Sequence, residues 1–158
     1  MQPRWLLYFN AGETPAVLMR YLSIDYGSKR VGLAICDAGE TIVSPLQLLK
    51  VDSSRPQRLI EQLERIIAEH QVEAIVVGLP LNMDDSEGPQ AKLTRRFVRQ
   101  LCNIVDKPVH FQDERLSSEA ADGMLAESGL SRKKRKEKRD MLAACEILND
   151  FLNRKRMT

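Results

Sequence analysis

The chain has 158 residues, of which 43% are hydrophobic and 29% charged, and its formal net charge at pH 7 is +2. This length favours a single domain with a sizeable core, and the near balance of charge means that any affinity for nucleic acid must come from a local patch. No apolar run is long enough to span a membrane. Cys36, Cys102 and Cys145 form no Cys-x-x-Cys pair, which is typical of a reduced, cytoplasmic protein rather than a disulfide scaffold.

The N-terminal stretch, residues 1–18, differs from the rest of the chain. Its apolar residues are interrupted by Glu13 and Pro15 and lack a basic start, so it matches a signal peptide poorly. Met19 stands directly before the first strand-like run. We therefore predict a loosely ordered extension over residues 1–18 and one domain over residues 19–158.

Two short apolar runs, residues 21–25 and 31–35, are joined by a glycine-containing turn and predict a β-hairpin. Alternation along the first run places Asp25 at the end of a core strand, where burying an unpaired carboxylate would be costly. With Lys29 and Arg30 in the turn that follows, this strand end is typical of an ion or phosphate site. The alternative is an aspartate that caps the turn through its own backbone.

Strand-like and helix-like patterns alternate along the rest of the chain. Residues 41–49 predict a third strand, bent or placed at a sheet edge by Pro45, and the continuous apolar run 73–78 predicts a strand buried on both faces. We also predict a strand over 107–112 and helices opened by residues 53–56 and over 90–105, 117–128 and 138–153. The order βββαβαβαα predicts an α/β protein with a mixed β-sheet, an antiparallel hairpin then parallel strands, and helices on both faces. That is the layout of the ribonuclease H-like fold.

Three stretches are expected to converge on the Asp25 end of this sheet, because sites in open α/β sheets lie beyond the carboxyl ends of the strands. Gly78 ends a buried strand and would allow close approach. Glu114 follows the strand over 107–112, and Asp140 precedes an apolar helix in which Ala143 and Ala144 are small enough to let the helix approach the sheet. Each stretch also has a structural alternative. Gly78 would simply connect the strand to a loop, the residues around Glu114 would cap the following helix, and Asp140 would interact favourably with the helix dipole.

Residues 132–139 hold seven basic residues directly before Asp140. A solvated loop is the usual fate of such a charge run, and we predict a loop that is mobile without substrate. A basic segment beside an acid cluster also suits a polyanion held over a metal site. Carboxylates spaced across a sheet would hold one or two Mg²⁺ or Mn²⁺ ions for phosphodiester hydrolysis.

The motifs are specific when taken together. They are Ile24-Asp-Tyr-Gly-Ser-Lys-Arg-Val-Gly-Leu-Ala34, Val77-Gly-Leu-Pro-Leu-Asn-Met-Asp84, Gln90-Ala, Asp113-Glu-Arg-Leu-Ser-Ser118, and Asp140 with its alanine-containing helix. Over nearly all of residues 20–152 the chain resembles the YqgF/RuvX family of pre-16S rRNA nucleases, also described as Holliday-junction-resolvase-like. The family pattern usually reads Val-Asp-Ser where this chain has Arg139-Asp140-Met141, so a hydroxyl beside the acid is lost.

The resemblance implies a hydrolase acting on ester bonds, a nuclease in rRNA processing and ribosome biogenesis. It implies catalytic, metal-binding acids at Asp25, Glu114 and Asp140. The residues expected to bind nucleic acid are Lys29, Arg30, Asn82, Arg115, Arg132, Lys133, Lys134, Arg135 and Lys136.

Two other functions stay open from the sequence. A Holliday-junction resolvase would work as a two-fold dimer, because two strands must be cut symmetrically, whereas no additional apolar helix face favours a dimer over a monomer here. A non-catalytic nucleic-acid-binding or ribosome-associated module would need the basic run but not the acids. Pre-rRNA is the favoured partner, with branched DNA as the alternative.

Overall fold

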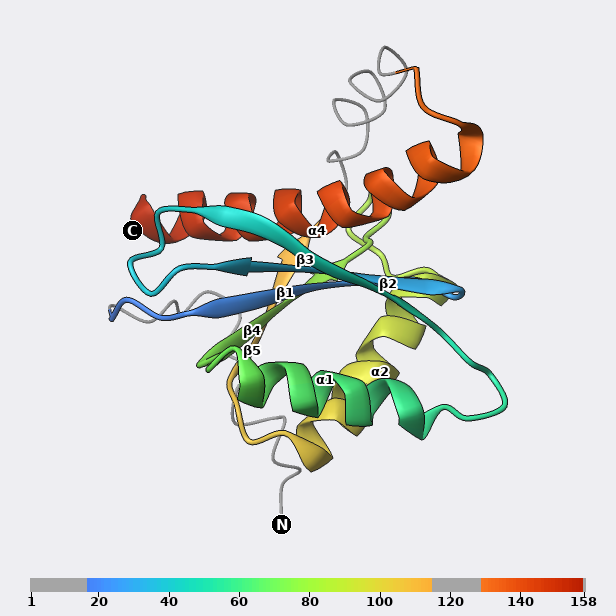
Figure 1. Cartoon of the computed structure of the whole chain (residues 1–158), viewed down its shortest axis with the longest axis horizontal. Coiled ribbons are helices and arrows are strands. Elements are labelled where there is room, and N and C mark those ends of the chain that lie inside the picture. The colour runs from blue at the N-terminus through green and yellow to red at the C-terminus, as the bar shows by residue number, and fades with distance from the viewer. Residues whose placement is uncertain (1–16, 115–128, 158) are drawn as a thin grey trace.

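The structure is a computed structural model that describes residues 17–114 and 129–157. Within these ranges the regular elements form three layers, with a sheet between helices (Figure 1). The elements are β1 (Tyr21–Tyr26), β2 (Arg30–Cys36), β3 (Val43–Lys50), α1 (Gln57–Glu69), β4 (Ala74–Leu79), α2 (Pro89–Ile104), β5 (Val109–Asp113) and α4 (Arg132–Arg156).

The sheet has the strand order β3-β2-β1-β4-β5. β2 pairs antiparallel with both β1 and β3, whereas β4 pairs parallel with β1 and β5. The predicted mixed sheet, a hairpin followed by parallel strands, is therefore confirmed. Because β1, β4 and β5 run in one direction, their carboxyl ends lie together at one end of the sheet.

The two faces of the sheet carry separate hydrophobic cores. α1 and α2 cover one face and α4 covers the other (Figure 1). Leu22 and Ile24 of β1 belong to the core beneath α1 and α2, whereas Tyr21 packs with Phe151 of α4. Every residue of β4 is buried, which explains its continuous apolar sequence.

β3 forms one edge of the sheet, as Pro45 predicted. Pro45 lies opposite Ala34 where the register between β2 and β3 shifts. A proline cannot donate to a ladder, so an edge strand with an irregular register tolerates it.

The basic run does not form the predicted loop. Residues 132–139 are the first turns of α4, which begins at Arg132 rather than at Lys138, and Ser131 caps it by accepting a hydrogen bond from the Lys134 backbone N–H at 3.3 Å. Lysine, arginine and glutamate are good helix formers, and no glycine or proline separates the run from the apolar part of the helix. The expectation of a loop was therefore wrong.

Some predictions fall outside the described residues, namely those for residues 1–16, for Arg115 and for a helix over 117–128. The three cysteines are buried and free of disulfides. Within residues 17–114 and 129–157, no helix is long and apolar enough to cross a membrane.

Candidate active site

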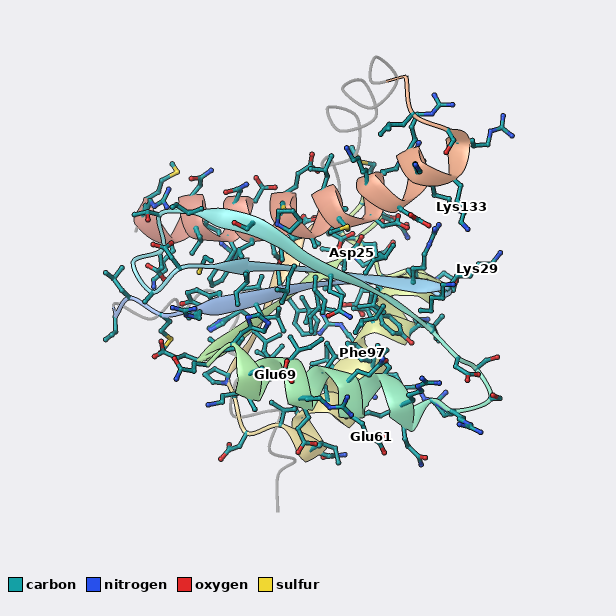
Figure 2. All side chains as sticks on the ribbon, viewed as in Figure 1. Asp25, Lys29, Glu61, Glu69, Phe97 and Lys133 are labelled. Atoms are coloured by element: carbon teal, nitrogen blue, oxygen red, sulfur yellow. The ribbon has the colours of Figure 1, made fainter. Side chains whose placement is uncertain are left out.

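The structure brings the three predicted acids together. Asp25 lies near the end of β1, Glu114 directly follows β5, and Asp140 belongs to α4. Figure 2 shows Asp25 between the sheet and α4. The carboxyl groups of Asp25 and Glu114 are hydrogen-bonded to each other, and the charge of Asp140 acts on Asp25.

Gly78 makes room for Glu114. It lies in β4, between the strands that carry Asp25 and Glu114. A Cβ atom at position 78 would lie 1.6 Å from Glu114 Oε1 and 2.5 Å from Ile147 Cδ1 of α4. Real Cβ atoms do not approach other atoms so closely, so any side chain here would displace the carboxyl group. The predicted close approach is made by Glu114 itself.

Gly32 lets α4 approach the sheet on the other side of Asp25. It pairs with Asp25 across the β1–β2 ladder, and a Cβ atom there would lie 2.3 Å from the Asp140 backbone oxygen. The Ser23 hydroxyl donates to the Ala144 carbonyl oxygen at 2.6 Å, which ties α4 to β1. Ala144 is fully buried, as expected if small residues bring α4 to the sheet. The matching space at Gly32 was not predicted.

Asp25 and Glu114 share a site that favours protonation. Burial is the main cause that raises the pKa of Asp25 to about 6, with a further rise from the charge of Asp140 and a fall from the hydrogen bond with Glu114. Burial, followed by the charge of Asp25, raises the pKa of Glu114 to about 8. Near neutral pH, Glu114 therefore donates its proton to an ionised Asp25.

Asp140 forms an ion pair with Arg30. The Arg30 Nε atom lies 3.1 Å from Asp140 Oδ2, and the two side chains are 19% and 29% exposed. Arg30 was predicted to bind phosphate. That prediction stays untested: Arg30 lies at the boundary between the acids and the basic residues, and its guanidinium group has other N–H donors besides Nε.

The β1–β2 turn is held by α2. The Gln90 side chain donates to the Tyr26 carbonyl oxygen at 2.9 Å, and the Tyr26 ring stacks on Phe97 with 4.3 Å between ring centroids. Gly27 N–H donates to the Arg30 carbonyl oxygen at 3.0 Å and closes the turn. These contacts fix the segment that carries both Asp25 and Arg30, as a preorganised site requires.

Most of the predicted basic residues surround one concavity. A pocket of about 680 Å³ is lined by Lys29, Arg30, Lys50, Val51, Arg132, Lys133 and Lys136. Lys50 was not predicted, because an isolated lysine at the end of a strand carries no sequence signal. Lys134 and Arg135 lie in the same turns of α4 but are absent from this lining. Asn82 is exposed in the loop after β4, where its side chain donates to the Ser86 hydroxyl at 3.0 Å.

The donor set suits a divalent cation. Within the described ranges, no three histidine, cysteine, aspartate or glutamate side chains are grouped closely enough to hold a metal ion as they stand. The three acids are instead held by a shared proton and by Arg30. Their oxygens are the ligands that Mg²⁺ and Mn²⁺ prefer, and a cation would relieve the repulsion between Asp25 and Asp140.

Comparison with known proteins identifies the family. The family model RuvX, described as Holliday junction resolvase, matches residues 19–154. The chain belongs to the RuvX family. A Chloroflexus aggregans relative named "Putative pre-16S rRNA nuclease" is 42% identical over 135 residues, which cover 85% of this chain and 94% of that one. A Listeria innocua relative of the same name is 39% identical over 135 residues, with 85% and 98% covered.

Solved structures share the fold of this RuvX chain. Thermus thermophilus RuvC matches with a TM-score of 0.51 and 16% identity, covering 87% of this chain and 96% of that one. The fowlpox virus Holliday junction resolvase matches with a TM-score of 0.53 and 14% identity, covering 85% and 98%. The predicted family, the ribonuclease H-like fold and the assignment to nuclease-type hydrolases are thus confirmed.

Proposed function

We propose that this RuvX protein is a metal-dependent endonuclease that hydrolyses phosphodiester bonds in the 5′-end processing of pre-16S rRNA, within the cytoplasm. The observation that carries the proposal is the convergence of Asp25, Glu114 and Asp140 beside a basic pocket. The names of the relatives from Chloroflexus and Listeria support the choice of RNA.

The three acids would act as the ligands of the cation. Loss of the proton shared by Asp25 and Glu114 makes both carboxylates available, and Asp140, which pairs with Arg30, supplies the third. The chemistry that a bound Mg²⁺ or Mn²⁺ ion supplies is activation of a water molecule and stabilisation of the leaving oxygen. The basic residues hold the strand by its phosphates, which gives affinity without reading its sequence.

Cleavage of a four-way DNA junction is the second candidate function. The description of the matching family and the resolvase fold of the structural relatives favour it. A resolvase would need a two-fold dimer that presents two acid clusters to two strands. Sedimentation of the protein with and without a junction therefore belongs beside the cleavage assay.

The test compares the native chain with Asp25→Asn on a 5′-extended pre-16S rRNA fragment and on a four-way DNA junction. Each is incubated with Mg²⁺, Mn²⁺ or EDTA. We expect metal-dependent cleavage of the RNA alone and its loss in the variant, because asparagine keeps the shape but not the charge of Asp25. Cleavage of the junction alone would favour the resolvase. Equal RNA binding by both proteins without cleavage of either substrate would instead support a non-catalytic module.

A further inference from the structure

The solvent-facing side of α2 carries cations and no acid. The sequence of this helix contains neither aspartate nor glutamate, and its basic residues are Lys92, Arg95, Arg96 and Arg99. At about 100° per residue, these four positions fall within an arc of about 100°, whereas the buried residues occupy the side that packs on the sheet. Lys92, Arg96 and Arg99 are exposed and Arg95 is partly buried. These four residues form the α2 basic ridge.

The neighbouring helix α1 shows what an ordinary solvated face looks like in this protein. It covers the same face of the sheet as α2 (Figure 1). Its exposed residues mix both signs, with Arg58 and Arg65 beside Glu61 and Glu64. A solvated face therefore accounts for the charges of α1, but it does not account for four cations without an acid on α2.

The arrangement of the ridge opposes helix formation. Lys92 and Arg96 stand four residues apart, as do Arg95 and Arg99, and like charges at this spacing destabilise a helix. α2 also has no acid in its first turn and no cation in its last turn, which is the opposite of what the helix dipole favours. Stabilisation of the helix therefore does not explain the ridge. A polyanion bound along it would relieve these repulsions.

Arg95 is held in place by its neighbours. Its Nε atom forms an ion pair with Glu87, and its guanidinium carbon lies 4.9 Å from the centroid of the Phe111 ring in β5. The guanidinium group has further N–H donors besides Nε. Because the ridge lies on a regular helix and one of its cations is already oriented, less conformational entropy is lost when a ligand binds.

The ridge starts near the acid cluster but does not belong to it. The Gln90 side chain, in the first turn of α2, donates to the carbonyl oxygen of Tyr26, the residue after Asp25. From there α2 runs along the face of the sheet opposite α4 (Figure 1). The basic pocket is formed by α4, the hairpin and the end of β3. The ridge is therefore a separate surface, and a ligand bound there contacts the protein away from the bond to be cut.

We propose that the α2 basic ridge binds a base-paired stem of the substrate RNA. The inference rests on the proposed function for its ligand, RNA. Single strands are usually bound in grooves where bases stack on aromatic rings, whereas double-stranded RNA is recognised by its shape and its backbone. The ridge is a convex helix surface made of cations. Three of its four cations are arginines, whose planar group matches the geometry of a phosphate, so the ridge binds stems of any sequence.

The test measures binding without cleavage, in full-length protein that carries Asp25→Asn. The probes are an RNA hairpin with a single-stranded 5′ extension and the extension alone, both measured by fluorescence anisotropy between about 50 and 200 mM salt. A double variant of the ridge, Arg96→Gln with Arg99→Gln, is compared with a double variant of α1, Arg58→Gln with Arg65→Gln. Both remove two exposed arginines from a helix on the same face of the sheet.

We expect the ridge variant to bind the hairpin about tenfold more weakly at about 0.1 M salt, with the slope of log K against log salt reduced by about 1.8, because two phosphate contacts are lost. It should bind the extension alone as its parent does. The α1 variant should match the parent for both probes. The substituted arginines are all exposed, so the variants should fold, and their melting temperatures verify this.

The proposal is overturned if the ridge variant keeps the affinity and salt slope of the parent for the hairpin. It is also overturned if the extension alone loses as much affinity, because the ridge would then hold a single strand. Equal competition by polyglutamate of the same charge would overturn it in favour of an acidic protein. The outcomes separate the two proposals. Cleavage with unchanged hairpin binding by the ridge variant refutes only the ridge, and weakened hairpin binding without cleavage by the native chain refutes only the enzyme.

Discussion

The carboxyl group of Glu114 fills the space that a side chain at position 78 would occupy, 1.6 Å from where the Cβ atom would stand. Glu114 thus reaches Asp25 across β4 only because Gly78 is a glycine. Register fixes the arrangement, since β4 and β5 pair through Leu79 and Asp113 just before Glu114. The position of one acid is therefore set by the backbone of the neighbouring strand.

Replacing Gly78 with alanine should abolish most of the activity while leaving the protein folded. The added methyl group displaces the Glu114 carboxyl group, and a shift of about 1 Å in such a group costs about 100-fold in rate. Overpacking at this buried site should also cost about 1–3 kcal/mol of stability. Gly88→Ala is the control, because its Cβ atom would meet only Asn82 at 3.6 Å. Full cleavage by Gly78→Ala would show that Glu114 is not held in this way.

Arg30 should have opposite effects on cation binding and on nucleic-acid binding. In Arg30→Gln, Asp140 loses its ion pair and the acid cluster loses a nearby positive charge, so Mn²⁺ should bind about fivefold more tightly, equivalent to about 1 kcal/mol. RNA should bind more weakly because the pocket loses a cation. Calorimetric titration of the protein with Mn²⁺, in the absence of RNA, measures the first effect.

Lys29→Gln separates the two roles, because Lys29 lines the same pocket and is exposed. This variant should weaken RNA binding while changing the affinity for Mn²⁺ much less than Arg30→Gln does. Weaker Mn²⁺ binding by Arg30→Gln would mean that the ion pair orients Asp140 for the metal rather than competing with it.

The fold could be predicted from the sequence because its signals are local. The period-two hairpin, the continuous apolar run of β4 and the proline of an edge strand each have one physical cause, and all three were predicted correctly. The start of α4 was not. Charge clusters usually form solvated loops, which led to the prediction of a loop. The helix propensity of lysine and arginine and the cap offered by Ser131 point instead to a helix.

Within the site, the positions of the acids could be predicted from the sequence, whereas the residues that surround and hold them could not. Asp25 and Glu114 stand at the carboxyl ends of strands, where sites in open α/β sheets lie, so the sequence alone marks them. The space at Gly32, the Arg30–Asp140 ion pair and the place of Lys50 in the pocket depend on which segments meet across the sheet. No local sequence pattern predicts these contacts between distant segments.

The shared proton predicts that stability falls as pH rises when divalent cations are absent. The pKa values of Asp25 and Glu114 in the folded chain, about 6 and about 8, exceed the ordinary values of 3.8 and 4.5. Between pH 4 and about 8, unfolding therefore releases protons, so the free energy of unfolding declines as pH rises and the loss is complete above about 8. Each pKa unit by which the folded value exceeds the unfolded value corresponds to about 1.4 kcal/mol of stability. Melting temperatures in EDTA measure the decline.

Glu114→Gln provides the comparison for this pH profile. Glutamine still donates a hydrogen bond to Asp25 but does not ionise. The melting temperature of the variant should therefore change less between pH 6 and 9 than that of the native chain. Parallel profiles for the two proteins would show that the pair does not share a proton.

The cap at Ser131 should control affinity for nucleic acid without any change of charge. Ser131→Ala removes the acceptor for the Lys134 backbone N–H, which costs about 1 kcal/mol at the helix end and frays the turns that hold Arg132 and Lys133. Ordering these turns must then be driven by binding, so RNA affinity should fall by up to about fivefold while the number of cations stays the same. Ser131→Thr, which keeps a hydroxyl acceptor, should restore most of it. Hydrogen exchange at Lys134 and Arg135 reports the fraying directly. If the exchange rates rise in Ser131→Ala but RNA binds as before, the cations act without the helix, and the basic run needs only its charge.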